Sequence, residues 1–257
     1  MKNFLKKISI ADTFSSLGIY PGDTVFIHGD AGVSLQYRDV NPQKRLYHLF
    51  CEIINYLGPT GTLVIPTFSY SFAKGEDFNP STTPSRVGLF SNFFLSLDNV
   101  KRSSNPIFSV AAIGKHAKLF MESNINDCFG KNTAFDILMS TNAISVCLGC
   151  EVRNMTFVHY VEQKNKVKYR YFKSFFGNLI INKKKSRLKT TYFVRKLIDE
   201  SKIDLNYFQN VSLQKGKLLK ANIGRFPVYA INVQNFTNIA SQLLADNQYA
   251  LIKKNCS

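Results

Sequence analysis

The sequence predicts an α/β protein: a three-layer sandwich with a central mixed, largely parallel sheet flanked by helices, plus a smaller β-rich basic region. Short apolar segments typical of buried strands alternate with helix-like segments. Glycine and proline separate these segments. After residue 165 the pattern changes to alternating basic and aromatic residues. We therefore expect a core over 1–165 and a basic region over 166–257, which ends in a helix and packs on the core.

The first part of the chain contains two predicted strands and one helix. Residues 23–28 are predicted to form a strand that enters a Gly-Asp-Ala-Gly loop, and 42–57 a helix that Gly58-Pro59 ends. Residues 61–66 form a second buried strand, which a proline terminates.

The middle of the chain continues this alternation. Pro84 stands where a first-turn proline is favoured, and it predicts a helix over 83–97. The remaining predicted elements are a strand at 108–113, a short helix at 134–139, a strand at 143–148 and a helix that Thr156 caps.

The basic region has its own pattern. Residues 167–176 alternate basic and aromatic side chains, which predicts a strand with one solvated face. Gly177-Asn178 is a predicted turn into 179–181, and the lysines at 183–185 a solvated hairpin tip or loop. We also expect a short helix over 192–200 and an amphipathic helix over 236–244.

The charge of the chain is strongly positive and unevenly distributed. There are 33 Lys and Arg against 17 Asp and Glu, a net charge of +16. Residues 164–196 contain twelve Lys or Arg and no acid. Such a field attracts nucleic acids, membrane headgroups or phosphorylated small molecules, and it repels polycations.

The five cysteines and the hydropathy of the chain indicate its cellular compartment and argue against a metal site and a membrane span. Cys147 and Cys150 form a C-x-x-C pair, but no second pair at zinc spacing accompanies them, so we expect free thiols and no metal. The apolar runs are too short to cross a bilayer. The basic N-terminus is followed at Ile8–Ile10 by a segment too short for a signal-peptide core, which predicts a cytoplasmic protein.

The segment Thr156-Phe-Val-His159-Tyr-Val-Glu162 carries the most chemical information. Residues three apart are neighbours on a helix, so His159 and Glu162 can touch. An imidazole oriented by a carboxylate is a general base near neutral pH. A structural ion pair on the helix face is the alternative, and the pair alone does not exclude it.

Five stretches in order along the chain support the catalytic interpretation. They are 22–28, 61–72, 83–88 running on to 102–109, the 156–162 motif, and Ile223-Gly224. Together these stretches resemble the aminoglycoside 3-N-acetyltransferase family, also called the antibiotic N-acetyltransferase family, whose members use acetyl-CoA. Relatives of this family also resemble enzymes that N-acylate amino sugars in surface-polysaccharide synthesis.

The resemblance implies roles for individual residues. His159 matches the base that deprotonates the substrate amine, and Glu162 the carboxylate of the same motif, although Asp30 or Asp204 is an alternative partner for the ring. The residues that the resemblance places beside acetyl-CoA are His28, Gly29, Thr67, Ser69, Ser85, Arg86 and Ser109. The family usually has histidine where this chain has Asn105, so a proton-handling role is in doubt at that position, although an amide can still orient a substrate.

Two of these residues, Thr67 and Ser69, follow a strand end, where ligands usually bind in α/β sheets. Their hydroxyls are candidate oxyanion donors, and satisfying a turn is the equal alternative. The candidate substrate-binding residues are Tyr70, Asn105, Thr156, Tyr169 and Arg170.

The charge decides between substrates at this stage. An aminoglycoside carries several ammonium groups and needs acids around it, whereas residues 164–197 contain none. We therefore expect acetylation of an amino sugar that is nucleotide-activated or part of a surface glycan. The alternatives are aminoglycoside acetylation that confers antibiotic resistance, and a non-catalytic protein of this fold that binds nucleic acid or another anion. The expected partners are acetyl-CoA and a small amino sugar, with no nucleic acid and no membrane span, and a homodimer stays open.

Overall fold

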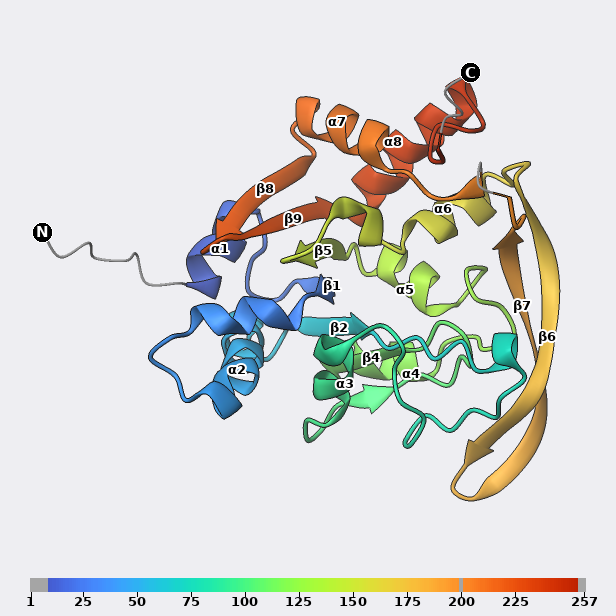
Figure 1. Ribbon diagram of the computed structural model, residues 1–257, viewed down its shortest axis with the longest axis horizontal. Helices are drawn as coiled ribbons and strands as arrows, with labels where there is room; N and C mark the ends of the chain where they lie inside the picture. The colour runs from blue at the N-terminus through green and yellow to red at the C-terminus, as the bar shows by residue number, and fades with distance from the viewer. Residues whose placement is uncertain (1–8, 199–200, 254–257) are drawn as a thin grey trace, which may run out of the picture.

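The computed structural model describes residues 9–198 and 201–253. The basic N-terminal run, Glu200 of the predicted helix at 192–200, and Cys256 lie outside these ranges. The described chain forms a central sheet between two layers of helices, and a long hairpin arches over one end of the molecule (Figure 1).

The central sheet has seven strands in the order β3-β4-β2-β1-β5-β9-β8. At its centre, β1 pairs in parallel with both β2 and β5, and the outer pairs are antiparallel. The strands are β1 (Thr24–Gly29), β2 (Thr62–Pro66), β3 (Lys101–Arg102), β4 (Val110–Gly114), β5 (Ile144–Leu148), β8 (Leu218–Ile223) and β9 (Phe226–Asn232). The predicted mixed sheet flanked by helices is confirmed, and β8 and β9 carry it across the 165/166 boundary that the sequence suggests.

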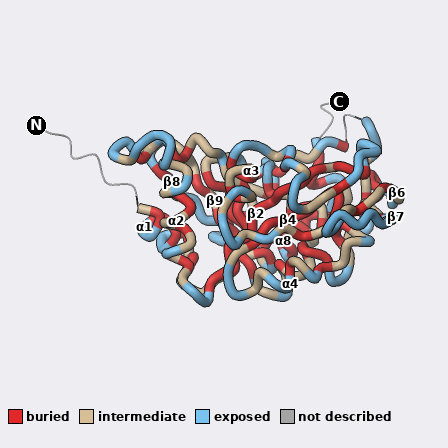
Figure 2. The backbone as a smooth tube through the Cα atoms, turned by 90° about the horizontal axis from the view of Figure 1, so that it is seen from below, coloured by how far each residue is buried: buried red, intermediate tan, exposed pale blue. Residues whose placement is uncertain are grey.

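Alternating side chains of the central strands build two hydrophobic cores, one on each face of the sheet. Val25 and Ile27 of β1 point into one core, whereas Phe26 between them points into the other. This alternation is the two-residue period of a strand that is buried on both faces. The backbone of the central strands is accordingly buried, and exposed residues lie in the outer helices, the loops and the hairpin (Figure 2).

Helices cover both faces. Helix α2 packs on the first core with Leu49, Phe50, Ile53 and Leu57, a spacing that gives one apolar stripe. The helices are α1 (Ile10–Ser16), α2 (Arg45–Leu57), α3 (Leu89–Leu95), α4 (Ala117–Met121), α5 (Ala134–Ser140), α6 (Val158–Lys164), α7 (Asn206–Gln214) and α8 (Val233–Asp246), with short 3-10 helices η1 (Ala31–Gln36), η2 (Pro42–Lys44), η3 (Phe72–Lys74) and η4 (Val152–Asn154).

The hairpin is formed by β6 (Arg170–Ile181) and β7 (Lys184–Arg195), paired along their whole length. Its two-residue turn is Asn182-Lys183, and both residues have positive φ, as the turn type that matches strand twist requires. The hairpin is tied to the rest of the molecule at both strands, since Ile180 N donates to Phe78 O at 2.8 Å and Thr191 N donates to Asn126 O at 2.8 Å.

Three predicted elements differ from the structure. The helix predicted from residue 83 begins only at Leu89, because Gly88 has a φ of 107° and the Asn92 side chain bonds both backbone groups of Ser85. Gly177-Asn178 does not turn, since β6 continues through both residues. The helix predicted over 192–200 is wrong, because residues up to Arg195 belong to β7.

The other long predicted helices are confirmed, including 42–57 and the C-terminal amphipathic helix. In the described ranges, no helix combines the length and apolarity that crossing a bilayer demands.

Candidate active site

The parallel strands at the centre of the sheet bring three chain segments together. β1 ends at Gly29, β2 at Pro66 and β5 at Leu148, and all three carboxyl ends lie at the same edge because the strands are parallel. The loops that follow are where ligands bind in open α/β sheets. Two cavities open here, one under the hairpin and one at the strand ends.

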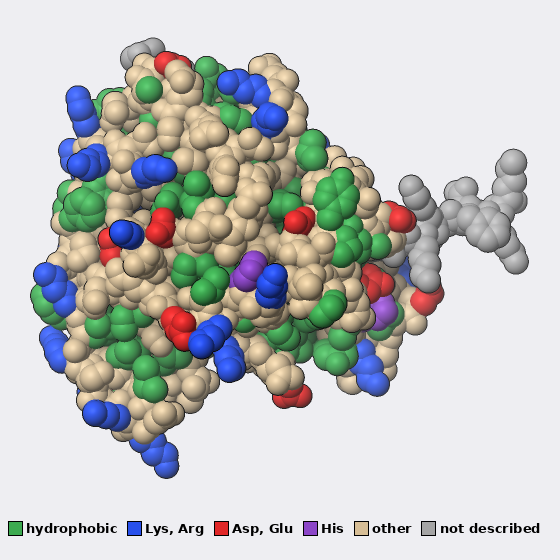
Figure 3. Space-filling view, turned by 180° about the vertical axis from the view of Figure 1, so that it is seen from behind, with side chains coloured by type: hydrophobic (Ala, Val, Ile, Leu, Met, Phe, Trp, Pro, Cys, Tyr) green, Lys and Arg blue, Asp and Glu red, His purple; other side chains and the backbone are tan. Residues whose placement is uncertain are grey.

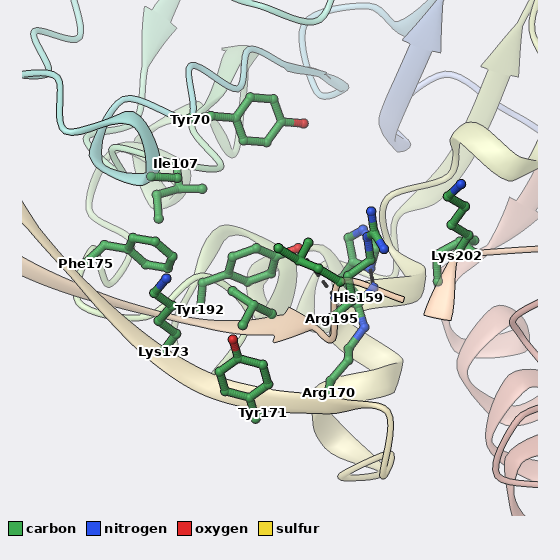
Figure 4. A pocket seen from close by; sticks show the side chains of 14 residues that line it. Tyr70, Ile107, His159, Arg170, Tyr171, Lys173, Phe175, Tyr192, Arg195 and Lys202 are labelled. Atoms are coloured by element: carbon green, nitrogen blue, oxygen red, sulfur yellow. Dashed lines mark hydrogen bonds between the residues drawn. The ribbon is translucent and has the colours of Figure 1, made fainter. Parts of the chain in front are cut away.

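The first cavity, which we call the hairpin cavity, has a volume of about 540 Å³. Tyr171, Lys173 and Phe175 of β6 and Tyr192 of β7 face it, with Tyr70 and Ile107 on the opposite wall (Figure 4). The other lining residues are Ala73, His159, Arg170, Val194, Arg195, Leu197, Lys202 and Ile203. The lining therefore contains basic and aromatic side chains and no Asp or Glu.

The histidine at this cavity is held by two charged neighbours. His159 Nδ1 lies 2.8 Å from Glu162 Oε2, so the contact that the sequence predicts is confirmed. Arg170 Nε lies 2.8 Å from the same oxygen, and Arg170 Nη2 lies 3.0 Å from His159 Nδ1. Glu162 has no exposed side-chain surface, whereas His159 keeps 17% of its side chain exposed.

This arrangement leaves one ring nitrogen for substrate. Because Nδ1 faces Glu162 and Arg170, Nε2 is the nitrogen on the opposite side of the ring. Burial and then the positive charge of Arg170 lower the pKa of His159, against the opposing effect of Glu162. Burial alone would raise the pKa of Glu162, but the hydrogen bond from His159 and the charge of Arg170 hold it below its ordinary value. The site therefore presents a neutral imidazole beside an ionised, buried carboxylate at neutral pH.

The second cavity, the strand-end cavity, has a volume of about 370 Å³. His28 and Gly29, the two residues at the end of β1 that the family resemblance places beside acetyl-CoA, line it. The other lining residues are Pro66, Phe68, Tyr70, Val87, Ser91, Cys150, Arg153, Asn154 and Thr156.

His28 is a neutral histidine in this cavity wall. Thr156 N donates to His28 Nε2 at 3.3 Å, and the Thr156 hydroxyl lies 2.8 Å from the same nitrogen. Burial lowers the pKa of His28 to about 3, although a backbone contact with Val146 opposes this shift. The hydroxyl of Thr156 thus links the segment before α6 to the end of β1 and does not cap α6, which corrects the capping role expected from the sequence.

Tyr70 is the residue that the two cavities share. Its φ is 56°, a left-handed conformation that is uncommon for a bulky residue. Backbone hydrogen bonds from residues 70 and 71 to the carbonyl oxygens of Ile107 and Pro106 hold it in this conformation. Burial, and then the nearby Tyr192, raise the pKa of Tyr70 to about 12. The hydroxyl is therefore protonated at neutral pH and available as a hydrogen-bond donor.

Four polar residues predicted to contact ligands form hydrogen bonds with the backbone inside the protein instead. Thr67 and Ser69 are fully buried and donate to Ser109 O and Pro106 O, at 3.1 and 3.0 Å. The Ser109 hydroxyl donates to Thr67 O at 2.8 Å. Asn105 accepts from Ile107 N and Phe108 N through its amide oxygen. None of these four lines either cavity, so the turn-satisfying alternative is correct for Thr67 and Ser69.

The other residues predicted to contact acetyl-CoA or to act with His159 line neither cavity. Ser85 is buried and accepts from Val87 N, and Arg86 pairs with Glu76 at 2.9 Å. Asp30 accepts from Gly32 N at 2.7 Å and caps η1. Asp204 accepts from Asn206 N. Glu162 is thus the carboxylate beside His159, which corrects the catalytic role expected for Asp30.

Tyr169 and Arg170, predicted to contact substrate, point instead toward Glu162. Tyr169 is buried, and burial followed by the charge of Glu162 raises its pKa. Only Arg170 also reaches the hairpin cavity. Tyr192 and Arg195 are not among the site residues expected from the sequence, because a helix is predicted over 192–200. The run Thr190-Thr-Tyr-Phe-Val194, rich in β-branched and aromatic residues, was the available signal for a strand.

The described residues include no candidate metal site. No group of three or more His, Cys, Asp or Glu side chains there has the geometry to hold an ion.

A family model described as aminoglycoside 3-N-acetyltransferase matches residues 45–245. The chain belongs to this family. The family assignment made from the ordered sequence stretches is therefore confirmed, and with it a family of acyl-CoA-dependent N-acyltransferases.

Individual relatives agree with this assignment. Aminoglycoside N(3)-acetyltransferase IV from Salmonella sp is 34% identical over 116 residues, which is 44% of this chain and 41% of that relative. The matched part is therefore less than half of the relative's length. The crystal structure of aminoglycoside acetyltransferase AAC(3)-Xa superposes with a TM-score of 0.79 at 16% identity, covering 93% of this chain and 92% of that one. A structure of AAC-IIIb binary with CoASH gives 0.77 at 17% identity, covering 92% and 94%. At these identities the two structures establish the fold.

Proposed function

We propose that the protein is an acetyl-CoA-dependent N-acetyltransferase that acts on a primary amine of an amino sugar, with His159 as the general base. The observation that carries the proposal is the buried Glu162 carboxylate beside His159 Nδ1, which orients a neutral ring toward the hairpin cavity. A neutral imidazole can accept the proton that the amine must lose before or during attack.

The two cavities suggest where the substrates bind. The strand-end cavity contains His28 and Gly29, which the family resemblance places beside acetyl-CoA, and a relative has been solved with CoASH. The hairpin cavity contains His159 and stacking side chains suited to a sugar. We assign acetyl-CoA to the strand-end cavity and the amine to the hairpin cavity, so that the acetyl group lies near Tyr70, which borders both.

The proposed reaction uses groups from both cavities. The amine nitrogen attacks the thioester carbonyl carbon while His159 Nε2 takes its proton. The Tyr70 hydroxyl, protonated at neutral pH, donates a hydrogen bond to the carbonyl oxygen as negative charge develops there. The carbon–sulfur bond then breaks, and the proton held by His159 returns to the thiolate, which gives an acetamide and free coenzyme A.

The comparisons favour an aminoglycoside as the acceptor. The matching family and the Salmonella relative are named for this substrate class, and one solved relative has sisomicin bound. None of these names points to surface-polysaccharide synthesis, so the aminoglycoside alternative is the first candidate.

One observation favours a second candidate. The hairpin cavity is lined by Lys173, Arg195 and Lys202 and by no acid. Lys and Arg side chains also follow the hairpin edge of the molecule (Figure 3). This lining attracts an acceptor that carries phosphate or carboxylate beside its amine, and it repels a polycation. The second candidate acceptor is therefore an anionic amino sugar.

A thiol-release assay tests the proposal and separates the two acceptors. We expect free thiol from acetyl-CoA only when an amine acceptor is present, and mass spectrometry should show one added acetyl group on that acceptor. Sisomicin and apramycin represent the first candidate, and a nucleotide-linked amino sugar represents the second. Replacing His159 by Ala should reduce turnover by about a hundredfold or more. No turnover with any amine, or an unchanged rate in H159A, would contradict the proposal.

A further inference from the structure

Arg170 of β6 is placed where it controls the catalytic pair. Its guanidinium is almost completely buried, with 1% of the side chain exposed. Nη1 donates to Phe193 O on β7 at 3.0 Å, which fixes the plane of the group. Nε and Nη2 then reach Glu162 Oε2 and His159 Nδ1, at 2.8 and 3.0 Å. One side chain from the hairpin therefore contacts both members of a pair located on α6.

Only one of the two contacts at His159 Nδ1 can be a hydrogen bond. Arginine can only donate hydrogen bonds, and an ionised carboxylate can only accept them. The shorter contact is to Glu162, which makes Nδ1 the protonated nitrogen and leaves a lone pair on Nε2. A second proton on Nε2 would create an imidazolium 3.0 Å from a guanidinium whose side chain is only 1% exposed, and burial strengthens the repulsion between the two charges. Glu162 offsets this repulsion only in part, because the same carboxylate oxygen is also paired with Arg170.

We propose that Arg170 is a positioning residue that holds Glu162 ionised and keeps His159 as the neutral Nδ1–H tautomer, ready to accept the amine proton on Nε2. This inference rests on the proposed role of His159 as the base. Its consequence is that docking of the hairpin and readiness of the base are linked, because the residue that sets the state of His159 belongs to the strand that forms the cavity wall.

The other groups around His159 are accounted for as follows. Glu162 is the only acid in contact with the ring among the described residues, and Phe108 and Phe129 present ring edges. The titratable or charged groups that share the cavity or flank the pair are Tyr70, Tyr169, Tyr171, Lys173, Tyr192, Arg195 and Lys202. The tyrosines Tyr70, Tyr169 and Tyr192 have raised pKa values and are neutral in this range, so Arg170 is the cation in direct contact with His159.

Titration of the histidines by nitrogen-15 NMR tests the inference without any substrate. The chain has four histidines, and a His159→Asn sample identifies the signals of His159. In the wild-type protein we expect a neutral Nδ1–H tautomer. In Arg170→Met and Arg170→Gln, His159 should titrate at higher pH, because the carboxylate then acts on the ring without an opposing cation. Arg170→Lys keeps the charge and should stay closer to wild type than either.

Activity gives a second readout with a characteristic shape. Below the pKa of a base, the active fraction falls about tenfold per pH unit. The acid limb of kcat/KM should therefore move to higher pH in Arg170→Met, whereas Glu162→Gln should move it in the opposite direction. Arg187→Met removes the same charge from an exposed position on the same hairpin and is the matched control.

Two outcomes would overturn the inference. One is a folded neutral variant, Arg170→Met or Arg170→Gln, whose His159 titrates as in wild type. The other is Arg170→Lys shifting as far as Arg170→Met, since the charge would then not be the cause. Normal titration in a protein that releases no thiol with any amine would instead refute the proposed function and leave the arrangement around His159 intact.

Discussion

At the residue scale, the site contains two histidines that burial keeps neutral for different uses. His159 retains contact with a cavity and with Glu162, so its neutral form is a proton acceptor. His28 has a pKa of about 3, and its Nε2 is engaged by Thr156. We infer that His28 shapes the strand-end cavity as a hydrogen-bond acceptor at Nε2 and takes up no second proton during the reaction.

The state of His28 makes a prediction about stability. Its pKa is lowered on folding, from 6.5 to about 3, so the unfolded chain binds the additional proton between these values. The stabilising contribution is complete above pH 6.5 and is lost as pH falls toward 3. At pH 5 the loss is about 2 kcal/mol, at about 1.4 kcal/mol per pH unit.

Replacing His28 by Gln should therefore flatten the decline of unfolding free energy between pH 6.5 and pH 4, as measured by urea denaturation. His48→Gln is the control, because His48 is partly exposed on α2. An equal acid dependence in His28→Gln and wild type would show that His28 is already protonated or solvated in the folded protein.

At the element scale, the hairpin β6–β7 decides the shape of the amine cavity, and its docking depends on one glycine. A Cβ atom at Gly177 would lie 2.5 Å from ring atoms of Phe72 in η3. The strand approaches η3 closely here, and two hydrogen bonds between β6 and Phe78 continue the contact. Gly177 is therefore needed for close packing, which explains why it does not form the turn that sequence analysis predicts.

Gly177→Val should loosen the hairpin from the molecule. Overpacking of this kind costs about 1–3 kcal/mol. We expect faster hydrogen exchange of the β6 and β7 amides with little change in β1, together with a higher KM for the amine and a nearly unchanged KM for acetyl-CoA. Phe176→Val, at the neighbouring exposed position, is the control. Uniform exchange changes across the sheet would mean that Gly177 supports global stability only.

Contacts that depend on local sequence spacing could be predicted from the sequence, whereas contacts between distant segments of the chain could not. The His159–Glu162 contact was predictable because three-residue spacing on a helix fixes it. The contact of both residues with Arg170 was not, because it depends on how a hairpin docks. Thr67 and Ser69 follow a strand end, as predicted, but the sequence could not reveal that their hydroxyls donate to backbone carbonyls.

At the scale of the whole molecule, the net charge of +16 is in tension with a polycationic substrate. The chain belongs to a family described as aminoglycoside 3-N-acetyltransferase, while the lining of the hairpin cavity has basic side chains and no acid. Long-range fields of this kind change association rates by about tenfold or more, and salt screens them. Substrate preference should therefore respond to single charge changes at the cavity wall.

Lys173→Glu tests this response directly. Lys173 projects from β6 into the hairpin cavity, so an acid there replaces repulsion of ammonium groups by attraction (Figure 4). We expect kcat/KM for sisomicin to rise by about tenfold relative to that for an anionic amino sugar, with the difference shrinking at high salt. Lys183→Glu makes the same change in net charge at the hairpin turn, outside the cavity, and should leave the ratio near its wild-type value. If both variants change the ratio equally, the global charge governs selection. If Lys173→Glu leaves the ratio unchanged, the acceptor does not bind beside Lys173, and the assignment of the hairpin cavity to the amine is wrong.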